Sequence, residues 1–139
     1  MTTLKAFGSS PAWGPARIAY VGEGGATTIA RDGSGTTVVA KSDDGIPAWS
    51  SAGRLALLER DNGRLAIRFP AGGTQILLPG LRPPIEGPPG LAWSPDGTRL
   101  AFTAVDAQGF PDVWAVGADG SGLARVTHRL GADNGVAWR

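Results

Sequence analysis

The stretch that decides the fold is GLAWSPDGTRLAFTAVDAQGFPDVWAVGADGSGLARVTH, residues 90–128. It holds four short apolar runs separated by turn residues, and the runs alternate in the manner of β-strands. Between the first two runs, PDG (95–97) suits a hairpin, because proline fixes φ and glycine accepts a positive φ. The glycine-rich DGSG (119–122) suits a second hairpin before the last run. The stretch therefore predicts four antiparallel strands and no helix.

The same pattern occurs twice earlier in the chain. An alanine followed by tryptophan opens each unit and returns near the C-terminus, at Trp13, Trp49, Trp93 and Trp138, with spacings of 36, 44 and 45 residues. The predicted units span about 10–41, 46–79 and 90–128 of a single segment, 1–139, with short extra strands at 3–7 and 136–139. Four antiparallel strands in every 36–45 residues are typical of a β-propeller blade, so we expect the tryptophans to pack between blades.

The third unit resembles the repeat of the TolB-like, WD-type propellers. The matching residues are Trp93, Ser94, Pro95, Asp96, Gly97, Ala101, Phe102, Asp112, Ala118, Asp119, Gly120, Ser121 and Gly122. The match is specific in this unit and degenerate in the first two. The resemblance implies an all-β fold of four-stranded antiparallel blades, three per chain, where propellers of this kind have six. It also implies protein–protein contact.

Three blades in a row leave two outer blade faces without a neighbour. We expect both to carry exposed apolar side chains, which a monomer tolerates poorly. Two chains could close a six-bladed ring, the chain could be a piece of a longer protein, or it could add to an open assembly. The closed homodimer is the favoured alternative. Trp13 and Trp138, near the two open ends, are the expected residues of the oligomer seam.

The composition excludes several kinds of site. The 139 residues include 0 Cys and 1 His, which excludes disulfides, thiolate zinc sites and a multi-histidine metal site within one chain. The 13 basic and 12 acidic residues give a net charge of +1, so we expect neither nucleic acid nor a membrane surface as a partner. No bilayer-spanning run or signal peptide is visible. A cytoplasmic location is the default expectation, or a periplasmic or extracellular one if a leader has been trimmed.

The residues that could carry chemistry favour structural roles. His128 is the single histidine, and no Gly-Xaa-Ser-Xaa-Gly nucleophile motif accompanies it. The aspartates of the glycine-rich turns, Asp32, Asp96 and Asp119, offer one carboxylate each, whereas Ca²⁺ takes six to eight oxygen ligands. We therefore expect turns at these aspartates and predict no catalytic residue, metal or cofactor.

The candidate binding residues lie on one face of the predicted blades. In propellers, connectors between blades share a face with the loops between the second and third strands, and loops tend to hold function. The candidates are Asp43, Asp44, Arg82, Glu86, Asp106, Gln108, Phe110 and Arg129. The proline-rich segment 79–90 is either a stiff connector or a docking element.

Three functions follow from this interpretation. The first is a non-catalytic module for protein–protein binding or scaffolding, which assembles through its open blade faces. The second is a self-assembling propeller fragment, natural or engineered, without a ligand. The third is a propeller piece of a prolyl-oligopeptidase-like peptidase. Fold alone does not decide among them.

Overall fold

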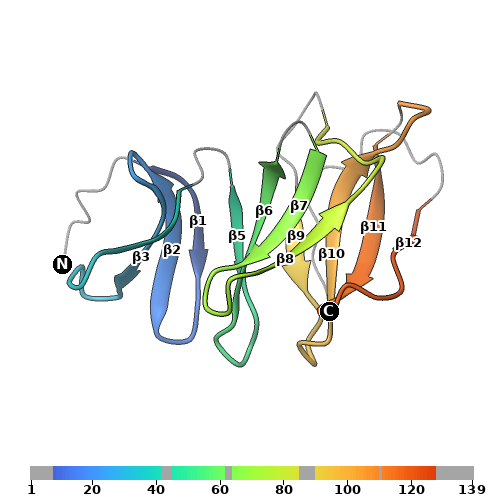
Figure 1. The fold of residues 1–139 in the computed structure, drawn as a ribbon. Coiled ribbons are helices and arrows are strands. Elements are labelled where there is room, and N and C mark those ends of the chain that lie inside the picture. Colours follow the sequence, from blue (N-terminus) through green and yellow to red (C-terminus); the bar gives the residue numbers. More distant parts are fainter. Residues whose placement is uncertain (1–7, 42–44, 62–63, 85–89, 110, 128–139) are drawn as a thin grey trace.

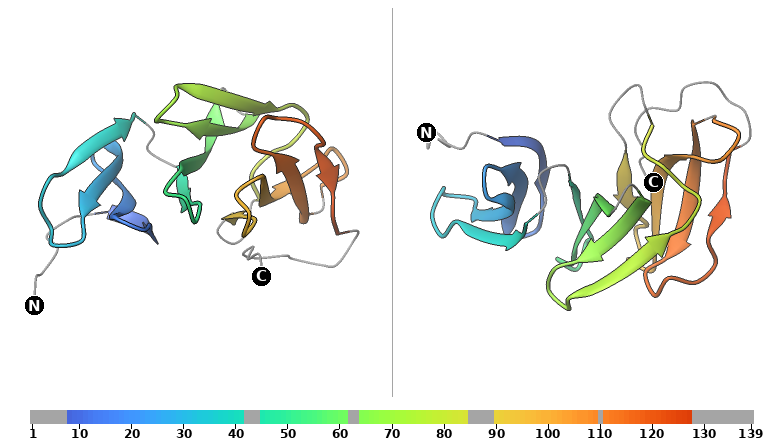
Figure 2. Two further views of the ribbon diagram at one scale, coloured as in Figure 1. Left: turned by 90° about the horizontal axis from the view of Figure 1, so that it is seen from below. Right: turned by 45° about the horizontal axis from the view of Figure 1, so that its top comes forward.

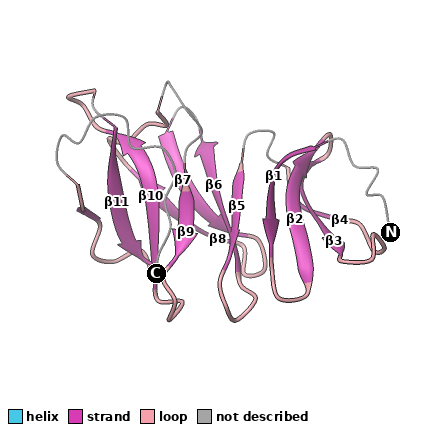
Figure 3. Ribbon diagram, turned by 180° about the vertical axis from the view of Figure 1, so that it is seen from behind, coloured by secondary structure: helices cyan, strands magenta, loops and turns pink. Residues whose placement is uncertain are grey.

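A computed structural model describes residues 8–41, 45–61, 64–84, 90–109 and 111–127. Within these ranges every regular element is a β-strand, and helix is absent (Figures 1 and 3). Accordingly, this part of the chain contains no helix that is long and apolar enough to cross a membrane. The strands predicted at 3–7 and 136–139 lie outside the described residues.

The strands form three separate four-stranded sheets, which we call blades 1, 2 and 3. Blade 1 contains β1 (Gly8–Trp13), β2 (Arg17–Gly22), β3 (Gly25–Ala30) and β4 (Thr37–Ala40). Blade 2 contains β5 (Ile46–Trp49), β6 (Leu55–Asp61), β7 (Arg64–Phe69) and β8 (Thr74–Leu78). Blade 3 contains β9 (Leu91–Trp93), β10 (Arg99–Val105), β11 (Pro111–Gly117) and β12 (Ala124–Arg125).

Each blade is an antiparallel meander in which the strands are ordered as they follow along the chain. The first strands lie on the inner side of the array, where β5 contacts both β1 and β9. Figure 2 shows the sheets arranged in an arc, with blade 2 between blades 1 and 3. The prediction of an all-β fold with four-stranded antiparallel blades is confirmed.

Alternation along the strands gives each blade two apolar faces. In β6, Leu57 packs with Ala26 and Ala40 of blade 1, whereas Leu58 belongs to the large core shared with blade 3. We call the face toward the preceding blade the leading face and the opposite one the trailing face. Because neighbouring residues of a strand point to opposite sides of the sheet, one strand can fill two inter-blade cores.

The first-strand tryptophans fasten one blade to the next. The indole Nε1 of Trp93 donates to the carbonyl of Ala48 in blade 2 at 3.0 Å, and Nε1 of Trp49 donates to the carbonyl of Ala12 in blade 1 at 3.2 Å. Trp93 is 7% exposed, and its ring lies 5.9 Å from that of Phe69. The same motif therefore makes the same contact at two successive interfaces, as the repeat predicts.

Close packing of Trp49 depends on a glycine in blade 1. A Cβ on Gly14 would lie 2.6 Å from Cδ2 of Trp49, although the φ of Gly14 is outside the left-handed region. We expect Gly14→Ala to lower the free energy of unfolding by about 1–3 kcal/mol in a urea titration, because the indole must move. The control is Gly72→Ala, whose Cβ would meet only Thr74 Oγ1 at 3.8 Å. A Gly14 variant as stable as this control would contradict the packing argument.

The outer faces of the array are exposed in part and buried in part. Ile18 and Ile29, on the leading face of blade 1, are buried, as are Ala101 and Ala115 on the trailing face of blade 3. Apolar exposure on these two faces is concentrated at the first and last strands of the end blades, where a flank of the sheet is open. Exposed apolar side chains are present on both outer faces, as expected, but they are fewer than a bare face would carry, because residues nearer the centre of each face are buried.

Candidate functional site

The connector between blades 2 and 3 lies against the loop that follows β10. Arg82 and Val105 form an isolated antiparallel bridge, with N to O distances of 2.9 Å and 2.8 Å in the two directions. Arg82 therefore lies next to the start of the loop that carries Asp106 and Gln108. The structure brings these three predicted residues to one side of blade 3. The other candidates, Asp43, Asp44, Glu86, Phe110 and Arg129, lie outside the described residues, as does His128.

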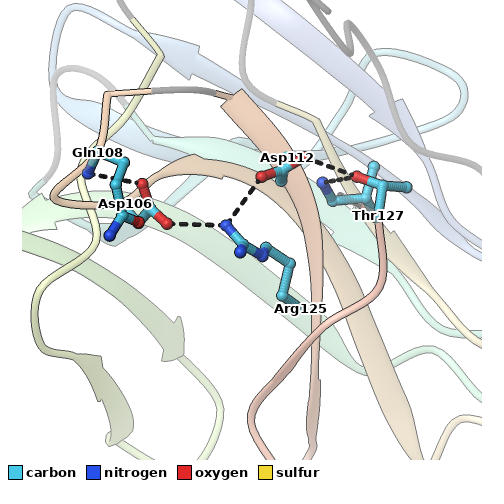
Figure 4. A network of polar contacts seen from close by, with 6 residues as sticks. Asp106, Gln108, Asp112, Arg125 and Thr127 are labelled. Carbon is cyan, nitrogen blue, oxygen red and sulfur yellow. Dashed lines mark hydrogen bonds and ion pairs between the residues drawn. The ribbon is translucent and has the colours of Figure 1, made fainter. Parts of the chain in front are cut away.

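The Asp106 carboxylate accepts hydrogen bonds from other residues of the chain (Figure 4). Its Oδ1 accepts the backbone N–H of Gln108 at 2.9 Å, and its Oδ2 accepts Nη1 of Arg125 at 2.9 Å. The same Arg125 nitrogen donates to Oδ2 of Asp112 at 3.2 Å. A loop aspartate predicted to bind a partner thus shares an arginine with an aspartate of β11.

Asp112 is the buried centre of this network. It is 0% exposed, and its Oδ1 accepts the Thr127 hydroxyl at 3.2 Å. The same hydroxyl accepts the backbone N–H of Val113 at 2.9 Å. Since Arg125 and Thr127 lie at and just beyond β12, the network fastens this two-residue strand to β11. This role was not predicted from the sequence, although Asp112 stands on the repeat pattern.

The aspartates of the glycine-rich turns accept hydrogen bonds from their own turns. Asp96 Oδ1 accepts the Ser94 hydroxyl at 2.7 Å and the backbone N–H and hydroxyl of Thr98 at 3.0 Å and 2.8 Å. These bonds, led by the Ser94 hydroxyl, lower the pKa of Asp96 to about 2. Gly97, with φ of 72°, makes the left-handed bend that lets the chain turn here.

The other two turns repeat this arrangement. Asp32 and Asp119 each accept the hydroxyl and backbone N–H of the serine two residues on, Ser34 and Ser121 respectively. The serine hydroxyl is the main cause that lowers the pKa of each aspartate. In the ranges that the structure describes, no three His, Asp or Glu side chains gather at a point. The turns predicted at these aspartates are present.

Two crevices open between adjacent blades. One, of about 570 Å³, lies between Arg54 of blade 2 and the Thr98–Arg99 and Gly117–Gly122 segments of blade 3. The Arg54 guanidinium lies 4.1 Å from the Phe69 ring centroid. The second crevice, of about 330 Å³, lies between Thr28 and Val39 of blade 1 and a set of blade 2 residues: Trp49, Gly53, Leu55, Pro70 and Ala71. Asp119 and Ser121 line the first crevice, where the Ser121 hydroxyl donates to Oδ1 of Asp119 within their turn. Both crevices lie at boundaries between blades.

The most unusual surface is the leading face of blade 1. Trp13 is 68% exposed, whereas its counterparts Trp49 and Trp93 lie between blades. The guanidinium of Arg31 lies 5.7 Å from the Trp13 ring centroid and is held by a 2.8 Å bond to the Gly14 carbonyl. Val38 is also exposed. It lies on the same face because it is in register with Thr27, which pairs with Tyr20. Trp13 is the seam residue that the structure describes, and Trp138 lies outside the described residues.

At the other end of the array, blade 3 has an exposed valine on its trailing face. Val126 is 57% exposed, and its N–H donates to the carbonyl of Val113 at 2.7 Å. Val113 pairs with Thr103, and both alternate with the residues that face blade 2. Each end of the array therefore carries an exposed valine at its outer margin, Val38 in blade 1 and Val126 in blade 3. The blade 1 end also carries the exposed Trp13 at its inner margin.

Comparisons with known proteins place the fold. No protein-family model matches the chain, and no curated protein matches it. Among solved structures, TolB from Acinetobacter baumannii matches with a TM-score of 0.68 at 20% identity, covering 89% of this chain and 33% of that one. A chain of the nidogen/laminin complex matches with a TM-score of 0.65 at 18% identity, covering 90% and 50%. The putative TolB from Agrobacterium tumefaciens matches with a TM-score of 0.62 at 19% identity, covering 88% and 47%.

These matches agree with the repeat pattern of the sequence. The chain spans between a third and a half of the length of each matched structure. Each match covers about nine-tenths of this chain, so it includes most of the length over which the three blades extend. The chain folds as a TolB-like β-propeller segment of about three blades.

Proposed function

We propose that this propeller segment is a non-catalytic module that binds other protein chains, and that the leading face of blade 1 is a binding surface. The observation that carries the proposal is the 68% exposure of Trp13. Its two counterparts use the same indole to join blades. A large exposed aromatic side chain with an N–H donor is typical of protein interfaces.

The polar side chains of the described residues support a binding role over a catalytic one. Asp32, Asp96 and Asp119 accept hydrogen bonds within their turns, and Asp106 and Asp112 share Arg125. Hydrolysis by a nucleophile needs a base within hydrogen-bond reach and a third group that orients it. Instead, the first three of these aspartates cap their turns, and Asp106 and Asp112 hold Arg125 beside β11.

The fold of the matched structures is compatible with this role. One of them is a chain solved in a complex of nidogen with laminin, two different proteins. Its identity to this chain is 18%, so it supports the fold and leaves the partner open. The proposal that Trp13 binds a partner rests on the exposure of its side chain and on its indole N–H donor.

Site-specific photo-crosslinking tests the proposal. Trp13 is replaced by p-benzoylphenylalanine in the cells that produce the protein, and the covalent adducts formed on irradiation are separated by mass. The matched control is the same replacement of Leu77, which is 58% exposed on β8, in a blade with neighbours on both sides. We expect an adduct with a polypeptide from position 13 and none from position 77. Adducts from neither position, or equally from both, would contradict a binding surface at Trp13.

A further inference from the structure

We propose that the partner at the leading face of blade 1 is a second copy of this chain, whose blade 3 docks there through its trailing face. The inference rests on the proposed function and specifies its partner. It is drawn from the two blade interfaces that the chain already contains. Those interfaces define what a leading face contacts in this repeat.

The donor and acceptor of the inter-blade bond occupy fixed repeat positions. The acceptors Ala12 and Ala48 each precede a first-strand tryptophan, and each pairs across its sheet with an alanine of the second strand, Ala19 and Ala56. In blade 3, Ala92 precedes Trp93 and pairs with Ala101 in the same way. Ala92 is therefore the acceptor position of the third blade, as Trp13 is the donor position of the first.

One chain carries both halves of such an interface at opposite ends. Blade 2 lies between blades 1 and 3, so Trp13 and Ala92 are kept apart within one chain (Figure 2). A second copy brings its own Ala92 position and trailing face. In the contact that we propose, Nε1 of Trp13 donates to the Ala92 carbonyl of the second copy.

Exposed valines match at the outer margin of the same contact. Val38 lies on the leading face of blade 1 at β4, and Val126 lies on the trailing face of blade 3 just after β12. Both strands are the outermost of their blades. Docking in the inter-blade geometry would bury Trp13 at the inner margin and place the two valines at the outer margin, which removes exposed apolar surface from water.

The proposed contact is heterologous, because two different faces meet. Such contacts either close into a ring or continue into an open filament. Two copies provide three blades each, and a closed pair would contain two identical seams. Each copy would then offer one leading and one trailing face, and no such face would stay open.

Light scattering on size-separated protein tests this arrangement with two single variants. Trp13→Glu places a charge on the leading face, and Val126→Glu places one on the trailing face. We expect the natural chain to have a mass near twice 14.2 kDa, and each variant alone to dissociate at least about a hundredfold more readily. An equimolar mixture of the two variants should again contain dimers, because one intact seam joins the unmodified face of each.

The controls separate assembly from folding. Both substituted side chains are more than half exposed, so each variant should melt cooperatively, as the natural chain does. Leu77→Glu, on an exposed residue of the middle blade, should keep the mass of the natural chain. Trp13→Phe keeps an apolar ring but removes the N–H donor, and we expect it to weaken each seam about fivefold, the effect of one hydrogen bond.

Several results would overturn the inference. A natural chain that stays monomeric up to about 0.1 mM would do so, since a useful seam must bind more tightly than this. A Val126→Glu variant that dimerises as well as the natural chain would show that the trailing face of blade 3 takes no part in the seam. A mixture that stays monomeric would show that the two faces do not meet. An adduct from position 13 with a different polypeptide would leave the proposed function standing while this partner fails.

Discussion

Replacement of Trp93 by alanine is expected to lower the free energy of unfolding by about 3–5 kcal/mol, the usual cost of removing a large buried aromatic side chain. The side chain is 7% exposed and packs beside Phe69 in the core between blades 2 and 3. The change also removes the donor to the Ala48 carbonyl. Both losses fall on a single interface, so the two blades should lose stability together.

Trp13→Ala is the matched control for this prediction. It changes the same residue type at the same repeat position, but the side chain is mostly in water, so we expect a loss within about 0.5 kcal/mol for the separate chain. Urea titrations followed by far-ultraviolet circular dichroism would compare the two variants, at a concentration at which the chain does not associate. Equal losses in both variants would mean that Trp93 does not fasten the blades as described.

Strand positions could be predicted from the sequence because their signals are local. The run RLAFT (99–103) lies within β10 (Arg99–Val105), and TQILL (74–78) coincides with β8 (Thr74–Leu78). Alternating apolar residues bounded by turn residues define a strand with little help from distant parts of the chain. The hairpin at residues 95–97 formed as predicted for the same reason, since Asp96 and Gly97 shape it through contacts within the turn.

The burial of a side chain was harder to predict from the sequence than the position of a strand. The alanine–tryptophan motifs look alike in the sequence, yet Trp93 is buried and Trp13 is exposed. The motif fixes where the indole lies in its own blade, whereas its burial depends on whether another blade lies against it. The contacts between successive blades therefore predict which surface should lie against the leading face of blade 1. The proposed second copy supplies that surface.

The network around Asp112 was missed for a related reason. Arg125 and Thr127 follow Asp112 by 13 and 15 residues, and they reach it only through the pairing of β12 with β11. The sequence signal was the aspartate at the start of an apolar strand run, where a charge is costly unless it is paired. An aspartate in such a place predicts a partner, but the register of the next strand is needed to identify it.

Asp112→Ala is expected to lower the free energy of unfolding by about 2–4 kcal/mol, because it removes one hydrogen-bond acceptor from both Arg125 and Thr127 in a buried polar network. Thr127 loses the carboxylate that accepts its hydroxyl, and Arg125 keeps the Asp106 carboxylate at 2.9 Å. The arginine side chain is 30% exposed, so water compensates part of its loss.

The matched control for the Asp112 variant is Asp106→Ala, which removes the other carboxylate from Arg125. Asp106 lies at the edge of the network, with a side chain that is 15% exposed, and we expect a loss of about 1 kcal/mol. Thermal unfolding followed by calorimetry would compare the two variants with the natural chain. The difference should arise in blade 3, since β12 pairs with β11 through two residue pairs and is otherwise held there by the bond from the Val126 N–H to the Val113 carbonyl and by this network. An Asp112 variant no less stable than the Asp106 variant would mean that backbone pairing alone holds the outermost strand of the blade.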